Sequence, residues 1–352
     1  MNIIGLIGCG RIANTHMMRA LSELKDVRVK YACDIIPGKA AALKEKYPKI
    51  ENAVEDYKVV LADAEVDAVF VLTPNYAHYT ITMDALKAGK HVMCEKPITV
   101  NYALAKEMAE EAKKQGKILN IGVCNRYNRS VEMLEEWNRT GRFGKIYHVY
   151  CSFRGFRSIP GLGGAFTTKA QSGGGVLIDW GVHFLDLILY VLGGAKIKNV
   201  TCDAYCEMAK DMKAYKYDSM WAEDTSDIEH GVNDVDDFIS GYVRTDKANI
   251  SFNGAWAQNV KQTDMYIDFM GDKGGARLEY GGKFVFFDGE RYEEIAPEYD
   301  IPNHYLCEDK AFFESIATGK KDKNNIENIL ESAKLLDALY ESAKIQKEVS
   351  FE

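Results

Sequence analysis

A regular alternation of apolar runs and helix-like segments in the first third of the chain constrains the fold most strongly. The apolar runs span residues 2–8, 27–34, 66–72, 91–94 and 117–123. The intervening segments have helical patterning and span residues 11–24, 37–47, 77–88 and 102–115. The run at 66–72 lacks apolar–polar alternation, which is typical of a strand covered on both faces. This order predicts an α/β fold with a doubly wound parallel sheet.

The pattern changes after about Cys124, where strand-like runs follow one another with few helices between them. These runs span residues 147–153, 199–205, 236–244, 249–256, 265–271, 276–280 and 284–287. They predict a second, mostly antiparallel sheet. We also expect an apolar helix at about 176–192 and an amphipathic helix near the end of the chain. The 352 residues predict two domains, 1–123 and an α+β domain at 124–352, with C-terminal helices (about 303–345) packing back on the body.

Composition excludes several classes of protein. The chain is 47% hydrophobic and 27% charged, values typical of globular domains, and its net charge of −8 argues against a nucleic-acid partner. The eight cysteines are scattered without a CxxC pair, which indicates free thiols in a reducing compartment. The N-terminus lacks the basic region of a signal peptide, and the apolar window 175–192 contains three charged or titratable residues, too many for a membrane span. We expect a cytoplasmic protein with no membrane partner.

A glycine pattern follows the first expected strand. Gly8-Cys9-Gly10-Arg11-Ile12-Ala13 has the G-x-G-x-x-A spacing that lets backbone approach a pyrophosphate at the start of a helix. Asp34 ends the second expected strand, about 20 residues further on, where an acid binds the ribose hydroxyls. A carboxylate there repels a 2′-phosphate, so the sequence predicts NAD rather than NADP, although Lys39 lies nearby.

Polar clusters follow the third and fourth of these predicted strands. They are Thr73-Pro74-Asn75, with His78 one turn later, and Glu95-Lys96-Pro97. Ligands of open α/β sheets bind beyond the carboxyl ends of the strands, so we predict cofactor contacts for Thr73, Pro74, Asn75, His78, Glu95 and Lys96. The alternatives are a solvated Lys96, a helix-capping Asn75, and a core or capping role for His78.

A second polar cluster lies in the expected apolar helix. Asp179, His183 and Asp186 follow Gly173-Gly174-Gly175 and share one helical face among apolar neighbours. Buried His and Asp side chains need partners or a function. Acid–base chemistry is the favoured interpretation; a structural network and a metal site are alternatives, and no third ligand cluster supports a metal.

Taken together, these motifs resemble the Gfo/Idh/MocA family of NAD(P)-dependent oxidoreductases. The resemblance rests on Gly8-x-Gly10-x-x-Ala13, Asp34, Thr73-Pro74-Asn75-x-x-His78, Glu95-Lys96-Pro97, and the glycine run followed by Asp179-x-Gly181-x-His183-x-x-Asp186. It implies a Rossmann domain joined to a large open-faced sheet, assembly as a homodimer or homotetramer, and a catalytic trio of Lys96, Asp179 and His183.

The resemblance also implies the chemistry. His183 would act as general base toward a secondary hydroxyl, Lys96 would stabilise the oxyanion, and Asp179 would orient the substrate or His183. The segments at residues 154–157, 159–161 and 166–169 resemble branches of the family that act on sugars and glycosides, some of which oxidise the sugar 3-hydroxyl. We expect substrate contacts from Lys96, Arg126, Arg157, Asp179, Trp180 and His183. The alternatives are a cyclitol dehydrogenase, an NAD-dependent redox glycosidase and a non-catalytic NAD-binding regulator.

Overall fold

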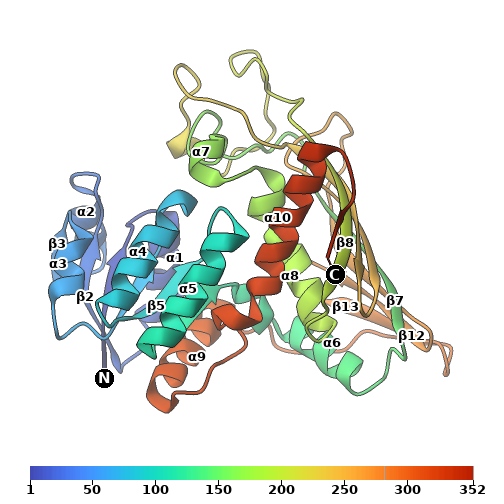
Figure 1. Ribbon diagram of the computed structural model, residues 1–352, viewed down its shortest axis with the longest axis horizontal. Helices are drawn as coiled ribbons and strands as arrows, with labels where there is room; N and C mark the ends of the chain where they lie inside the picture. The colour runs from blue at the N-terminus through green and yellow to red at the C-terminus, as the bar shows by residue number, and fades with distance from the viewer. Residues whose placement is uncertain (281, 352) are drawn as a thin grey trace. The chain divides into compact units, whose positions relative to one another are not determined.

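The computed structural model describes residues 1–280 and 282–351 (Figure 1). The chain divides into two compact units. Unit 1 comprises Met1–Tyr127 together with Pro302–Leu330, and unit 2 comprises Asn128–Ile301 and the residues from Glu331 onward. The chain therefore leaves unit 1 after Tyr127 rather than at the expected residue 123, and it returns to that unit for residues 302–330.

Unit 1 is built on a six-stranded parallel sheet with the order β3-β2-β1-β4-β5-β6. The strands are β1 (Asn2–Ile7), β2 (Val27–Cys33), β3 (Asn52–Val54), β4 (Ala68–Val71), β5 (His91–Glu95) and β6 (Leu119–Gly122). All four residues of β4 are buried, as its apolar run predicts. The predicted doubly wound parallel sheet is confirmed, and its order reverses between β1 and β4, where ligands of such sheets bind.

Helices cover this sheet. The helix α1 (Arg11–His16) continues as a π-helical turn, η1 (Met17–Leu21), and packs with α2 (Lys39–Lys46) and α9 (His304–Thr318) over one apolar core. The helix α4 (Asn75–Lys87) contacts α3 (Tyr57–Ala62) on one side and α5 (Tyr102–Gln115) on the other (Figure 1). The placement of α9 explains why residues 302–330 belong to unit 1: Phe312 of α9 meets Phe70 of β4 edge to face, with ring centroids 5.7 Å apart.

Unit 2 contains a nine-stranded sheet with the order β14-β13-β12-β11-β7-β10-β9-β8-β15. The strands are β7 (Ile146–Arg154), β8 (Ile197–Tyr205), β9 (Phe238–Thr245), β10 (Asn249–Ala255), β11 (Asp264–Gly271), β12 (Gly274–Glu279), β13 (Phe284–Asp288), β14 (Glu293–Ile295) and β15 (Val349–Ser350). All neighbours are antiparallel except β7 and β10, which run parallel. The predicted mostly antiparallel sheet is confirmed.

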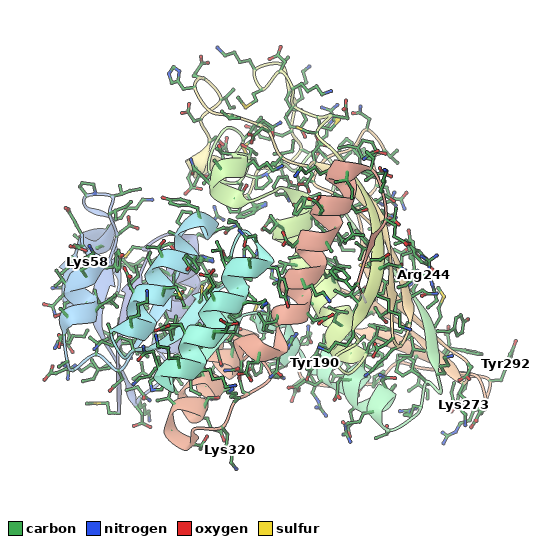
Figure 2. All side chains as sticks on the ribbon, viewed as in Figure 1. Lys58, Tyr190, Arg244, Lys273, Tyr292 and Lys320 are labelled. Carbon is green, nitrogen blue, oxygen red and sulfur yellow. The ribbon has the colours of Figure 1, made fainter. Side chains whose placement is uncertain are left out.

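The apolar face of this sheet shares a core with α6 (Arg129–Arg139), α8 (Val182–Val191) and α10 (Leu330–Ile345). The opposite face carries polar and aromatic side chains in cross-strand contact. Asn253, for example, donates a hydrogen bond to the Tyr150 hydroxyl (2.9 Å), and Arg277 lies over the Tyr266 ring. At the turn between β13 and β14, Tyr292 is 85% exposed and points away from the sheet (Figure 2).

One helical stretch, residues 169–191, is long and apolar enough by composition to cross a membrane. Most of its apolar window is buried inside the protein, and it contains α8, whose Phe184 and Ile188 belong to the core of unit 2. This segment is therefore a core helix of unit 2.

Candidate functional site

The turn after β1 has the backbone geometry that a dinucleotide phosphate requires. Gly8 has φ +99°, and a Cβ there would lie 2.5 Å from the Leu72 carbonyl oxygen, so only glycine fits. Gly10 is extended immediately before α1, and a Cβ on it would meet nothing within 4 Å. Ala13 is fully buried against the sheet, as the small third position of the motif predicts. Arg11 is exposed at the start of the helix and Ile12 is half-buried.

Asp34 lies just beyond β2 and organises the loops around this turn. One carboxylate oxygen accepts a hydrogen bond from the Cys9 N–H (2.9 Å), and the other accepts one from the Ile36 N–H (2.9 Å). Asp34 is only half-buried, so its remaining lone pairs can accept from ribose hydroxyls. Ile35 and Ile36 are exposed and offer no cationic clamp for a 2′-phosphate.

The end of β4 adds a buried polar atom to this edge. Oγ1 of Thr73 is buried without a hydrogen-bond partner among the described residues, as expected of a hydroxyl placed to meet a ligand. Pro74 is exposed in the capping position, and α4 begins at Asn75 itself, so Asn75 is not the helix cap. These features, with the glycine turn and Asp34, fit a dinucleotide.

His78 has a different place from the one predicted. It is fully buried, and its two ring nitrogens each lie 2.8 Å from a carbonyl oxygen, Nδ1 from Pro97 and Nε2 from Thr73. Both polar atoms of the ring are thus engaged with backbone. The structure therefore favours the core role of His78 over the predicted contact with the cofactor.

Lys96 lies half-buried directly after β5, and Glu95 beneath it is buried. Oε2 of Glu95 accepts a hydrogen bond from the Lys96 N–H (3.1 Å), while Oε1 lies 3.3 Å from Nε2 of His16. These contacts hold the Lys96 backbone, and a cofactor contact from Glu95 stays a prediction. The sequence analysis missed His16, whose signal is a polar residue on the buried face of α1.

In unit 2, Asp179 lies in a π-helical turn, η3 (Leu177–Gly181), which leads into α8. Such turns are rare and frequently mark functional sites. Asp179 is 8% exposed, and the half-buried His183 has its ring 6.3 Å from that of Tyr280. The half-buried Trp180 packs against Gly155, where a Cβ would lie 3.0 Å from the indole.

Two residues that the sequence analysis did not single out fix the start of this helix. The carboxylate of Asp236 accepts hydrogen bonds from the Gly175 N–H (2.7 Å), the Leu177 N–H (2.9 Å) and the Tyr340 hydroxyl (2.9 Å). A Cβ at Gly175 would lie 1.9 Å from the Asp236 carbonyl oxygen, and one at Gly174 would lie 2.0 Å from Oη of Tyr340. The glycine run therefore exists because the Asp236–Tyr340 pair lies against its backbone.

Asp186, the last acid of the motif, is buried and accepts a hydrogen bond from Oγ of Ser332 (2.6 Å). It ties α8 to α10, which is the structural alternative for this residue.

The two arginines predicted to contact substrate form hydrogen bonds with other segments of the chain. Arg126 is 3% exposed and donates to the carbonyls of Lys323 (2.7 Å) and Asn328 (3.2 Å). Arg157 donates to the Lys216 carbonyl (2.8 Å) and to Oδ1 of Asn259 (2.6 Å). Both guanidinium groups therefore fasten loops, and a substrate contact from either arginine stays a prediction.

One group among the described residues has the composition of a metal site. Donor atoms of His16, Glu308 and Asp309 all lie within 4.8 Å of one another, and all three side chains are buried. The His16 ring nitrogens already face the carboxylates of Asp309 and Glu95 at 3.3 Å. A protonated imidazole supplies positive charge at this point, so the geometry does not require an ion.

Comparisons with known proteins match two parts of the chain to known families. Residues 3–123 match the family described as "Oxidoreductase family, NAD-binding Rossmann fold", and residues 131–277 match the "GFO/IDH/MocA C-terminal domain". The first unit is accordingly an NAD-binding domain, as predicted.

Relatives extend the match over nearly the whole chain. D-glucoside 3-dehydrogenase of Escherichia coli K12 is 30% identical over 342 residues, covering 97% of this chain and 95% of that protein. Myo-inositol 2-dehydrogenase of Thermotoga maritima is 28% identical over 323 residues, covering 90% and 89%. The solved structure of levoglucosan dehydrogenase in complex with NADH has the same fold, with a TM-score of 0.85 at 20% identity over 100% of this chain and 99% of that chain.

Proposed function

Because this chain belongs to the Gfo/Idh/MocA family of NAD-dependent oxidoreductases, we propose that it oxidises a secondary hydroxyl of a sugar or glycoside, at the 3-position. Membership of the family shows that the protein is a dehydrogenase related to those of glucosides and inositols. The specific hydroxyl and the roles of individual residues are the proposal.

The observation that carries it is the match to a glucoside 3-dehydrogenase over 97% of the chain, because a match of that extent includes both units. The dinucleotide turn and Lys96 lie in unit 1, and Asp179, Trp180 and His183 lie in unit 2. The π-helical turn at Asp179 further supports a functional role for this helix.

The proposed cofactor is NAD in preference to NADP, held by the Gly8–Ala13 turn, Asp34 and Thr73. The Asp34 carboxylate accepts from both ribose hydroxyls and repels an added phosphate. A bound nicotinamide would supply the acceptor for the hydride of the substrate carbon.

The protein's own groups manage the proton and the charge on the substrate oxygen. In the proposal, the neutral imidazole of His183 takes the hydroxyl proton, because histidine is the side chain most often used as a general base near neutral pH. The Lys96 ammonium donates a hydrogen bond to the same oxygen and stabilises its developing negative charge. Asp179 orients the substrate or His183, and Trp180 offers an aromatic surface to the sugar.

A cyclitol is the second candidate substrate. It is favoured by the 28% identity to myo-inositol 2-dehydrogenase over 90% of the chain. The same three side chains serve this reaction, because a ring-borne secondary hydroxyl is oxidised in either case. A cytoplasmic location and a homodimer or homotetramer complete the proposal; the polar and aromatic face of the large sheet, with Tyr150 and Tyr266, is the surface offered to a second copy.

Position-specific deuterium transfer tests the proposal. Methyl glucosides deuterated at carbon 3 are incubated with protein and NAD, with carbon-2-deuterated glucosides as the matched control. We expect deuterium in the reduced cofactor only from the carbon-3 label, and loss of the transfer in His183→Asn with retained NADH binding. Transfer from carbon 2 alone, or from inositol alone, would replace the 3-hydroxyl assignment. Release of methanol without net NADH would support the redox-glycosidase alternative.

A further inference from the structure

We propose that two buried histidines, His16 and His78, are positioning residues that clamp the turn carrying Lys96 from its two sides. The inference rests on the proposed function, because it assigns a role to residues that act through Lys96. Neither histidine belongs to the proposed set of groups that touch the substrate.

His16 acts on the first side of the turn, through Glu95. Its ring is fully buried, with Nε2 3.3 Å from Oε1 of Glu95 and Nδ1 3.3 Å from the Asp309 carboxylate. Oε2 of the same Glu95 accepts the Lys96 N–H at 3.1 Å. A Cβ at Gly122 would lie 2.9 Å from Oε1 of Glu95, so the carboxylate is confined between His16 and β6. The orientation of the Lys96 peptide is therefore linked to α9 through three consecutive contacts.

The charges around His16 explain why it is a histidine. Glu95, Glu308 and Asp309 are all buried, and an uncompensated carboxylate in such surroundings is costly. When Glu95 and Asp309 are ionised, both neighbours of the ring are acceptors, and a ring protonated on both nitrogens donates to each of them. Burial alone lowers the pKa of His16, but the Asp309 and Glu95 carboxylates outweigh this and raise it well above its usual value. An imidazolium thus bridges two carboxylates beneath the lysine.

His78 acts on the second side of the turn, through Pro97. Its Nδ1 lies 2.8 Å from the Pro97 carbonyl and its Nε2 lies 2.8 Å from the Thr73 carbonyl. These two acceptors again require two donors. Burial lowers the pKa of His78, but the adjacent Cys94 and the two carbonyls raise it to about 9. A charged ring therefore joins the loop after β4 to the residue that follows Lys96.

The two clamps meet on consecutive residues. Glu95 is fixed by its side chain, Lys96 by its N–H and Pro97 by its carbonyl, so the backbone on each side of the lysine is held by a buried cation. A catalytic group displaced by about 1 Å can lose about 100-fold in rate. Loss of the rigid support of this turn is therefore expected to lower the turnover rate measurably.

The test compares His16→Gln and His78→Gln with a matched control, His91→Gln. His91 lies at the opposite end of the same strand, half-buried, where its Nδ1 accepts the Ile118 N–H (3.0 Å). All three variants remove a structural hydrogen bond from unit 1. Each purified protein is assayed for thermal unfolding, NADH binding, kcat and KM, and Lys96 is observed by NMR after reductive methylation with ¹³C-formaldehyde. The signal is assigned with Lys96→Arg.

We expect the two clamp variants to bind NADH normally, to lose kcat by about 10- to 100-fold with little change in KM, and to show a displaced Lys96 signal. His91→Gln should lose stability but keep kcat and the native signal. If His16→Gln does not fold, Asp309→Asn replaces it, because this variant weakens the same bridge from α9. We expect a partial loss of kcat in Asp309→Asn. The inference would be overturned if the clamp variants showed the native Lys96 signal and a native kcat per folded molecule.

Two further outcomes are distinguishable. Full turnover by Lys96→Met would refute the proposed role of Lys96 in catalysis, whereas a displaced Lys96 signal in the clamp variants would still support the clamp. One equivalent of tightly bound metal in purified protein, found by elemental analysis and lost in His16→Gln, would replace the imidazolium bridge with an ion held by His16, Glu308 and Asp309.

Discussion

The two ends of β5 use buried charge in different ways. At the amino end, His91 accepts a hydrogen bond from Ile118, and burial together with Lys117 lowers its pKa to about 4, so the ring is neutral. At the carboxyl end, His16 and His78 each face two polar partners, and the pKa of each ring is raised. Parallel sheets bind ligands at the carboxyl ends of their strands, and the charged histidines lie at that end.

A buried lysine sharpens this contrast. Lys90, 5% exposed at the amino end of β5, donates to the carbonyls of Asp63 (2.7 Å) and Val66 (2.8 Å). It ties one local turn together, and burial lowers its pKa. At the other end, the Lys96 N–H donates a hydrogen bond to the Glu95 carboxylate (3.1 Å). The same residue type thus fastens a local turn at one end of the strand and follows the strand at the end where ligands of parallel sheets bind.

The largest expected effect comes from replacing each of these two lysines separately with methionine. Lys96→Met should lower kcat by at least about 100-fold, because it removes the hydrogen-bond donor to the developing oxyanion, while NADH binding is retained. Lys90→Met should lower the unfolding temperature and leave kcat near the native value. Steady-state kinetics and NADH fluorescence measure both. Equal losses of kcat in the two variants would erase the distinction between the strand ends.

Next in size is the loss of the acid beyond β2. Asp34→Ala should weaken NAD binding about 10- to 100-fold, since hydrogen bonds to a charged group are lost, and it should bind NADP relatively better. Asp34→Asn keeps an acceptor for the Cys9 N–H and so separates loss of charge from collapse of the loop. Calorimetric titration with both cofactors gives the ratio, and an unchanged preference in both variants would contradict the role of Asp34.

The pH dependence of stability should reveal the charge of the His78 ring. The pKa of His78 is about 9 in the fold against an ordinary 6.5, so its contribution is complete below pH 6.5 and is lost as pH rises through 9. This linkage amounts to about 3 kcal/mol. Denaturant unfolding between pH 6 and 10 should therefore show a decline that His78→Gln flattens. Identical curves for the two proteins would mean that His78 is neutral.

His91 should give the smallest effect, with the opposite sign. Its pKa is lowered to about 4, so its contribution is complete above pH 6.5 and is lost as pH falls toward 4. The ring is partly exposed, and solvent screening makes the effect smaller than that of His78. The difference in unfolding free energy between native protein and His91→Gln, measured from pH 4 to 7, should shrink on acidification. A constant difference would mean that the fold does not lower the pKa of His91, which would contradict the contrast between the two ends of β5.

Much of the framework was predictable because it depends on local patterns. Five of the six parallel strands coincide with apolar runs, and the glycine turn and Lys96 lie at the strand ends where these runs place them. β3 was missed because it has three residues, of which Asn52 and Ala53 are exposed. Its short, exposed segment carries no apolar run.

The supporting residues of the candidate site were not predictable for another reason. His16 and Asp309 are 293 positions apart, and Asp236 meets Tyr340 across 104 positions. Each is a single polar residue in a buried segment, and neither periodicity nor spacing identifies its partner. The same holds for Arg126, whose burial follows from contacts with the returning segment 302–330.

Mass spectrometry of a mixed panel of sugars, glycosides and cyclitols, incubated with the protein and NAD, tests the central claim most directly. We predict that one class of compound, the glycosides, loses two hydrogens per molecule with an equal amount of NADH formed. A panel that stays unchanged, while nicotinamide cofactor remains bound to the protein, would contradict a dehydrogenase acting on these hydroxyls and would favour a non-catalytic NAD-binding regulator.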